Sequence, residues 1–179
     1  MTALLLALAL PASADCRDDL AAKVAAAAAR RPALAGLSIE TRLFRHDSDF
    51  GQAWPGSAWR APASRRYLVR LNERLCGDPP PAAALDALIL HELAHVEDYS
   101  RRSAFSLLRL GWSYLRDDES AVAAHERAMD DAVVEAGGAG GLLMYRRWML
   151  ERVTPEAAAR KRRVYRMPEE LAALTLGRR

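Results

Sequence analysis

The segment that most constrains the fold is an apolar run from Ala87 to Asp98 that carries His91 and His95 four residues apart. On a helix, residues four apart lie on the same face, with Cβ atoms about 5–6 Å apart. Two imidazoles on that face can occupy two corners of the tetrahedron that Zn²⁺ prefers. Glu92 lies about 100° further around such a helix, where its carboxylate could take a proton from an activated water. The segment therefore predicts a buried helix that carries a zinc site.

The alternative interpretation of this segment is an amphipathic helix with two histidines in its core. Histidine is scarce in the chain, with four in 179 residues, so composition is a poor explanation of the spacing. An apolar core also rarely includes two imidazoles and a carboxylate among leucines. We therefore favour the metal site.

Length and composition predict one domain, over residues 15–179, that is mainly helical. The chain has 179 residues and is 51% apolar, enough for one core but not for two. Alanine is abundant and aromatic residues make up 7%, which favours helices over a large sheet. We expect an α+β, mainly α fold, with a small antiparallel sheet of two or three strands on the zinc helix and a helical C-terminal extension. The mild net charge of +3 does not indicate nucleic-acid binding.

The N-terminal residues 1–14 resemble a signal peptide. They form an uncharged apolar run that ends in the small residues Ala12, Ser13 and Ala14, the pattern of a cleavage site. A buried N-terminal helix is the alternative. No other segment reaches the roughly 18 uncharged residues of a membrane span. We expect an exported protein, either periplasmic or secreted.

The chain contains two cysteines, Cys16 and Cys76, and both follow the predicted cleavage site. A pair is the minimum for a bridge in an oxidising compartment. We expect a disulfide that ties the new N-terminus to the segment before the zinc helix, with two unpaired thiols as the alternative.

Patterning and helix signals predict the other elements. They comprise helices over 18–31, 118–136 and 142–153, two more that begin at Thr154 and Pro168, and strands over 37–43 and 67–71. The zinc helix should start at residue 81 or 82 after three prolines and run to about Ser100. Residues 45–66 form an ordered loop in which Trp54 and Trp59 pack, or line a substrate cleft. The strand over 67–71 should be an uncovered edge to which an extended peptide could add. The alternative is that the loop from Trp54 to Trp59 caps this edge and keeps the enzyme latent.

The helix over 118–136 carries a second set of acidic residues. Glu119, Glu126 and Asp130 fall on one face at the 3.6-residue period. If that face packs on the zinc helix, a third ligand is available there. His125 lies one position off the face and is a weaker candidate.

Three parts of the chain together resemble the minimal catalytic core of the gluzincin-type zinc metallopeptidases. They are the strand Tyr67 to Asn72, the run Leu90-His91-Glu92-Leu93-Ala94-His95, and the later Glu126-Arg127-Ala128-Met129-Asp130. The resemblance implies that His91, His95 and Glu126 are the zinc ligands, with Glu119 as the alternative third ligand. It implies that Glu92 is the general base and that Asp130 orients a ligating histidine. Metzincins would have Gly at 98 and a ligand at 101, where this chain has Asp98 and Arg101.

The function that these features predict is zinc-dependent hydrolysis of peptide bonds in the cell envelope, on a protein or peptide substrate. One alternative is a non-catalytic envelope binding protein that keeps the fold, and another is a zinc amidase that acts on cell-wall peptide. The resemblance supplies no oxyanion-stabilising group; Tyr145 and Tyr165 are candidates.

Two segments indicate contact with an anionic membrane surface as an alternative to ordinary packing. Residues 105–115 mix Trp, Tyr and Arg with aliphatic residues, which suits core or lid packing or an interfacial segment. The basic cluster 160–163 suits a solvated helix face or contact with anionic lipid.

Overall fold

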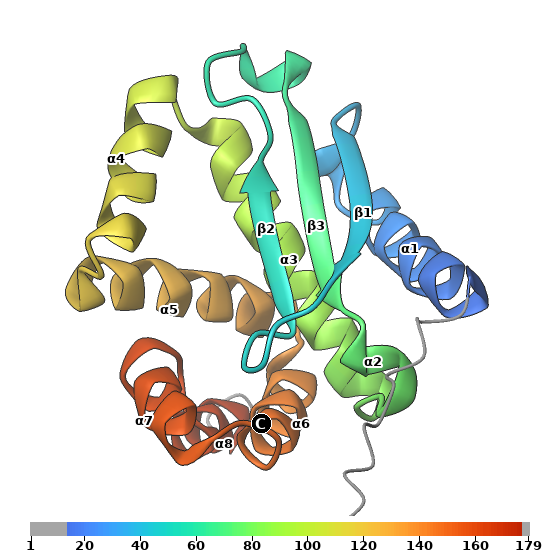
Figure 1. The fold of residues 1–179 in the computed structure, drawn as a ribbon, viewed down its shortest axis with the longest axis vertical. Coiled ribbons are helices and arrows are strands. Elements are labelled where there is room, and N and C mark those ends of the chain that lie inside the picture. The colour runs from blue at the N-terminus through green and yellow to red at the C-terminus, as the bar shows by residue number, and fades with distance from the viewer. Residues whose placement is uncertain (1–13, 177–179) are drawn as a thin grey trace, which may run out of the picture.

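The computed structural model describes residues 14–176, so the predicted signal peptide lies outside the described residues apart from Ala14. The fold is α+β and mainly α, as predicted, with helices around one small sheet (Figure 1). Its α-helices are α1 Ala14–Ala29, α2 Arg74–Gly77, α3 Ala82–Arg101, α4 Ala104–Leu115, α5 Glu119–Glu135, α6 Ala139–Leu150, α7 Pro155–Val164 and α8 Pro168–Leu176. Its strands are β1 Ser38–Phe44, β2 Gly51–Pro55 and β3 Arg66–Asn72, with 3-10 turns at Pro32–Leu34 and Pro62–Ser64. None of the helices in residues 14–176 is long and apolar enough to cross a membrane.

The sheet differs from the prediction in two ways. Its strand order is β1-β3-β2, with β1 parallel and β2 antiparallel to β3, so it is mixed rather than antiparallel. The central strand is β3, which was predicted to be the edge. The strand that covers it, β2, lies within the predicted loop 45–66. The prolines and glycines of that segment favoured a loop, so its five-residue strand was not predicted. Pro55 is tolerated in β2 because an edge strand does not need every backbone donor.

Asn72 holds the loop that carries the chain from β1 across the end of β3 to β2. This side chain is 1% exposed and donates hydrogen bonds of 2.6 Å to the carbonyls of His46 and Asp49. Its oxygen accepts from the backbone N–H of Arg74 at 3.0 Å. One buried amide therefore fixes the crossover that places β2 on the outside of the sheet.

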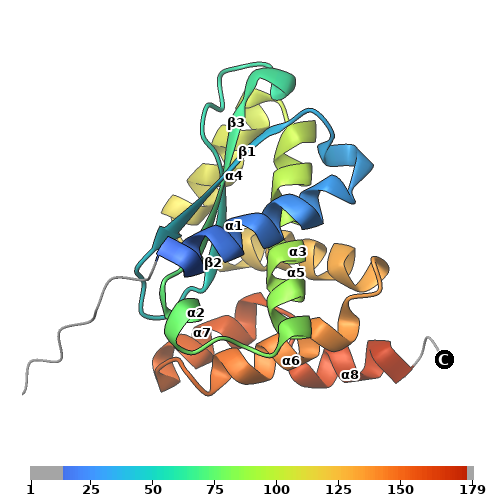
Figure 2. The ribbon, with the colours of Figure 1, turned by 90° about the vertical axis from the view of Figure 1, so that its right-hand side faces the viewer.

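Helix α3 covers one face of the sheet and forms the centre of the core (Figures 1 and 2). The alternate residues Tyr67, Val69 and Leu71 of β3 are fully buried, as expected for the strand face that meets a helix. Helix α1 lies against α3 and β1, and the predicted disulfide between Cys16 and Cys76 joins α1 to α2. Burial on several sides makes α3 a rigid base for its side chains.

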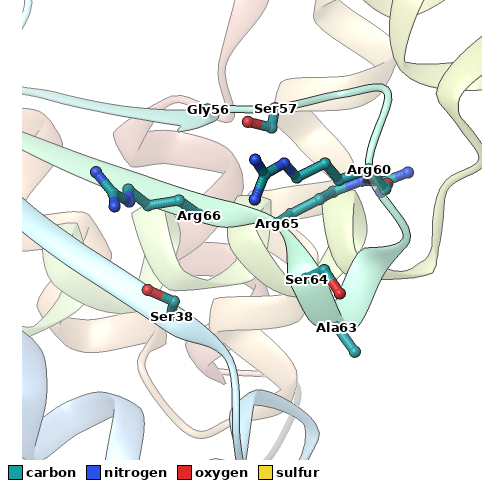
Figure 3. A pocket seen from close by; sticks show the side chains of 8 residues that line it. All are labelled: Ser38, Gly56, Ser57, Arg60, Ala63, Ser64, Arg65 and Arg66. Atoms are coloured by element: carbon teal, nitrogen blue, oxygen red, sulfur yellow. Dashed lines mark hydrogen bonds between the residues drawn. The ribbon is translucent and has the colours of Figure 1, made fainter.

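Both ends of α3 are fixed by the sequence. The helix begins at Ala82, directly after Pro81, as predicted. At its C-terminal end the buried Arg65 donates to the carbonyls of Tyr99 and Arg102 at 2.9 and 2.7 Å, which satisfies groups that the helix leaves unpaired. Beside Arg65 lies a basic hollow of about 450 Å³ at the end of the sheet (Figure 3), with no residue of the predicted zinc site in its lining.

Helix α5 packs against α3 and matches the prediction closely. It is capped by Asp118, whose side chain accepts from the N–H of Ala121, and the chain leaves it through Gly137 at φ +83°. The C-terminal helices also form where predicted, with Thr154 capping α7. Residues 104–115 form helix α4, which the sequence pattern had left unassigned.

Candidate metal centre

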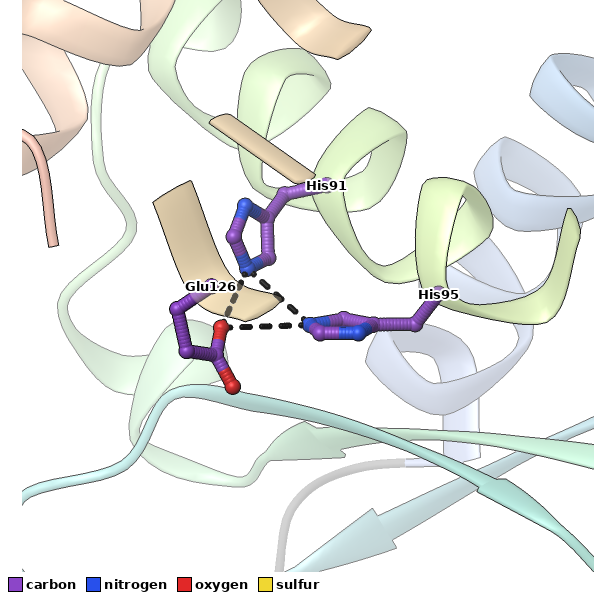
Figure 4. Close-up of side chains that lie close together, drawn as sticks. All are labelled: His91, His95 and Glu126. Carbon is purple, nitrogen blue, oxygen red and sulfur yellow. Dashed lines mark hydrogen bonds and ion pairs between the residues drawn. The ribbon is translucent and has the colours of Figure 1, made fainter. Parts of the chain in front are cut away.

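Three buried side chains from α3 and α5 meet at one point (Figure 4). The Nε2 atoms of His91 and His95, one helical turn apart, are 3.2 Å from each other. Glu126 Oε2 lies 3.1 Å from His91 Nε2 and 3.2 Å from His95 Nε2. The three residues are 3–6% exposed. The structure therefore brings together the two predicted imidazoles and the predicted carboxylate.

The size of this triangle fits a metal ion such as zinc. Bonds of about 2.0–2.1 Å from a tetrahedral zinc ion place its ligand atoms about 3.3–3.4 Å apart. The three observed separations of 3.1–3.2 Å are close to that value. Within residues 14–176, this group supplies three ligand atoms, which leaves the fourth corner of a zinc tetrahedron open. Three protein ligands with one open position are typical of a catalytic site rather than a structural zinc site.

Glu92 lies beside the triangle with a carboxylate oxygen that has no partner. The residue is 4% exposed, and its buried Oε2 accepts no hydrogen bond from residues 14–176. Burial raises the pKa of Glu92 to about 8, and a bound divalent cation would favour the ionised form again. A buried carboxylate with a free oxygen is suited to take up a proton.

Asp130 lies behind His91, where the resemblance placed it. Its Oδ1 is 3.0 Å from His91 Nδ1 and accepts a 2.6 Å hydrogen bond from the buried Arg146. Its Oδ2 accepts from the backbone N–H of Arg166 at 2.9 Å. A carboxylate on the far nitrogen orients a ligating imidazole and makes it a stronger ligand.

The charges at the centre favour a bound cation. Burial works against ionisation of Glu126, yet the imidazoles of His95 and His91 hold its pKa well below the usual range. Burial likewise opposes charge on His91, but Asp130 and Glu126 together raise the pKa of this imidazole. A metal ion would replace the proton as the positive charge between these carboxylates.

Glu119, the alternative third ligand, does not join the histidines. It lies at the exposed start of α5, where its Oε2 accepts a 2.7 Å hydrogen bond from Arg163. His125, the weaker candidate, is buried beside the centre but has other partners, since its Nε2 is 3.1 Å from Asp98 Oδ2. Of the acidic residues on that face of α5, Glu126 is the one placed to bind a metal.

Tyr114 is a site residue that the sequence did not reveal. It reaches in from α4, and its hydroxyl donates a 2.5 Å hydrogen bond to Glu126 Oε1, the oxygen that points away from the histidines. The same hydroxyl is 3.0 Å from His125 Nδ1. No spacing in the sequence relates α4 to the two site helices, so Tyr114 could be found only in three dimensions.

The two tyrosines predicted as oxyanion candidates have different positions. Tyr165 lines the cleft above the centre, with Arg146 stacked on its ring at 4.3 Å. Tyr145 is buried in the core, where its ring stacks on Trp148. Of the two predicted candidates, Tyr165 is therefore the one that lines the cleft.

A cleft of about 180 Å³ opens over the centre. It lies between the outer strand β2 and helices α3 to α5, and Trp54, which is 54% exposed, borders it. Its lining residues are Asp49, Gly51, Gln52, Ala53, Trp54, His91, Glu92, His95, Tyr114, Glu126 and Tyr165. A neighbouring hollow of about 470 Å³ shares Asp49, Tyr114, Glu126 and Tyr165 with it. The predicted packing of Trp54 and Trp59 is wrong, because both rings are largely exposed.

Gly51 of β2 touches the carboxylate of Glu92. A Cβ atom built on Gly51 would lie 2.4 Å from Glu92 Oε1, far inside contact distance. The strand backbone can approach the carboxylate this closely only because residue 51 has no side chain.

The chain matches no protein-family model, no curated protein and no solved structure. Conclusions about its function therefore come from the geometry of the centre.

Proposed function

We propose that the protein is a zinc-dependent metallopeptidase of the gluzincin type. The observation that carries this proposal is a triangle of two imidazole nitrogens and one carboxylate oxygen of zinc-ligand size. Its open corner faces a cleft, and the free carboxylate of Glu92 lies beside it. A site that only stabilised the fold would be closed by a fourth ligand and would gain nothing from a base.

In the proposed reaction, zinc held by His91, His95 and Glu126 would polarise the scissile carbonyl and lower the pKa of the attacking water. Glu92 accepts the proton of that water and passes it to the leaving amine. Asp130 keeps His91 oriented, and Tyr114 holds the second oxygen of Glu126. The closed surroundings of the centre strengthen these interactions.

The first expected result concerns the metal. Protein purified without chelator should contain about one equivalent of zinc by elemental analysis, because three ligands converge at zinc distances. His91→Ala and Glu126→Gln should lower the zinc content and affinity strongly, whereas Glu119→Gln should retain wild-type zinc. Absence of metal from the wild-type protein, or equal loss in Glu119→Gln, would contradict the ligand set.

We propose that an extended substrate adds to the free edge of β2, in place of the edge predicted at residues 67–71. Hydrogen bonds join Gly56 to Arg66 and Asn72 to Phe50 at the two ends of the β2–β3 ladder. By the alternation of antiparallel pairs, Gln52 and Trp54 face β3 with their backbone groups, so those of Gly51 and Ala53 face the cleft side. Main-chain binding of this kind favours unfolded substrates with loose sequence preference.

Ala53→Pro tests this binding mode, because it removes one outward N–H without removing a ladder bond. We expect KM for unfolded protein substrates to rise about fivefold to tenfold, the loss of roughly one hydrogen bond. Ala53→Val keeps the N–H and is the matched control. Equal kinetics for the two variants, with zinc content unchanged, would exclude strand addition at residue 53.

Two other functions remain as alternatives to peptide hydrolysis in unfolded proteins. A cell-wall amidase would use the same metal chemistry, and a binding protein would use the cleft without turnover. A panel of unfolded proteins, short peptides and cell-wall fragments separates the three.

We further propose that the protein is exported, because its disulfide would persist in an oxidising compartment.

A further inference from the structure

Helix α4 buries little of its surface against the rest of the molecule. Leu107 is its one residue that is fully buried. Phe105, Leu108, Trp112 and Leu115 are 42–80% exposed, and their spacing of three, four and three residues aligns them in one stripe. Figure 1 shows α4 at the edge of the molecule. Tyr114, which contacts Glu126, lies on the opposite side of the helix.

Unpaired positive charge lies beside this stripe. Arg109 and Arg116 are exposed, fall next to the stripe around the helix, and have no acidic partner among residues 14–176. Arg116 extends over the ring of Trp112 at 5.7 Å. The acidic residues that follow are engaged elsewhere, because Asp117 pairs with Arg160 and Asp118 caps α5. The stripe therefore presents apolar side chains and free cations together.

The basic cluster 160–163, the other candidate for lipid contact, is largely used within the fold. Lys161 is 8% exposed and bonds to Asp49 at 2.8 Å. Arg160 and Arg163 pair with Asp117 and Glu119. Within this cluster, Arg162 is the residue that is exposed without an acidic partner in the described chain. This cluster therefore ties α7 to its neighbours, whereas Arg109 and Arg116 lie beside an exposed apolar stripe without an acidic partner in the described chain.

We propose that the stripe of α4 docks on the surface of a bilayer that contains anionic lipid. Phe, Leu and Trp on one side of a helix, with arginines beside them, are the composition of helices that lie in the headgroup region. The arginine stems can cover apolar surface while their guanidinium groups reach phosphate. A protruding helix also fits a fluid surface better than it fits a rigid partner, which would have to supply a matching groove. Docking by α4 does not depend on the zinc chemistry.

The test is vesicle flotation of the full protein, after mass spectrometry has identified its N-terminal residue. Wild-type protein should bind vesicles that contain phosphatidylglycerol and bind neutral phosphatidylcholine vesicles much less. Each cation near an anionic surface contributes about fivefold in affinity, so Arg109→Glu with Arg116→Glu should weaken binding by at least about 25-fold. Phe105→Ser with Leu115→Ser should weaken it about tenfold or more.

Two matched variants serve as controls. Arg162→Glu removes an exposed arginine outside α4, and Met144→Ser removes an exposed apolar side chain of α6 that is 41% accessible. Both should bind lipid as the wild type does, and circular dichroism should show all variants folded. Failure of the wild type to float, or equal loss in Arg162→Glu and the α4 charge variant, overturns the proposal. So does a stable dimer, seen by light scattering, that Phe105→Ser with Leu115→Ser dissociates.

Discussion

Glu92→Gln is expected to lower peptide hydrolysis by about 10²–10⁴-fold while the zinc stays in place. Glutamine has the shape of the native side chain but cannot take up the proton of the attacking water. Because Glu92 Oε2 makes no hydrogen bond within the described residues, the change should leave the fold unperturbed. The measurement is kcat/KM on an unfolded protein, with zinc content determined on the same samples.

The matched control for Glu92→Gln is Glu97→Gln on the same helix. Glu97 lies outside the cleft lining and bonds to Arg31 at 2.6 Å, so its loss should affect stability slightly and the reaction hardly at all. His95→Ala supplies the contrast, because activity and zinc should fall together. Activity near the wild-type level in Glu92→Gln would remove Glu92 from the reaction and leave a metal site of another purpose.

The second large effect is expected when the disulfide is removed. The bridge between Cys16 and Cys76 spans 60 residues and joins α1 to the segment before α3. In the chain-entropy model, a loop of that length stabilises the folded state by about 4 kcal/mol. For a chain of this size, that corresponds to a fall of roughly 8–16 °C in Tm. Calorimetry of zinc-saturated Cys16→Ser/Cys76→Ser protein against the oxidised wild type measures it.

A reductant that does not bind zinc supplies the control for this result. It should lower the Tm of the wild type to that of the double variant and leave the double variant unchanged. If oxidised and reduced wild-type proteins have the same Tm, the disulfide does not stabilise the fold and the prediction is wrong.

Helices α3 and α5 were predictable because their determinants are local. Pro81 sets the start of α3, and Asp118 caps α5. Once the segment is helical, the four-residue spacing of the histidines places both imidazoles on one face. The choice between Glu119 and Glu126 was not local. It depends on where α5 crosses α3 and on Arg163, which lies 44 residues later on α7 and donates a hydrogen bond to Glu119.

The sheet was only partly predictable, for a related reason. Alternation identified β1 and β3, but their parallel pairing and the insertion of β2 depend on a crossover that the buried Asn72 holds. A short edge strand that contains Pro55 has little pattern of its own. Tyr114 stayed hidden because α4 exposes its apolar side, the reverse of the pattern that marks a helix packed on a core.

The contact between Gly51 and Glu92 has a consequence for where a substrate would be cut. If a peptide adds to β2, the base meets the strand at residue 51, so the scissile bond should lie opposite Gly51 whatever the peptide sequence. Residues bound toward Trp54 and those bound toward Asp49 would then fall on opposite sides of the cut. We expect Gly51→Ala to shift or blur the cleavage positions within one protein substrate. Trp54→Ala should change only which side chains are preferred at those positions.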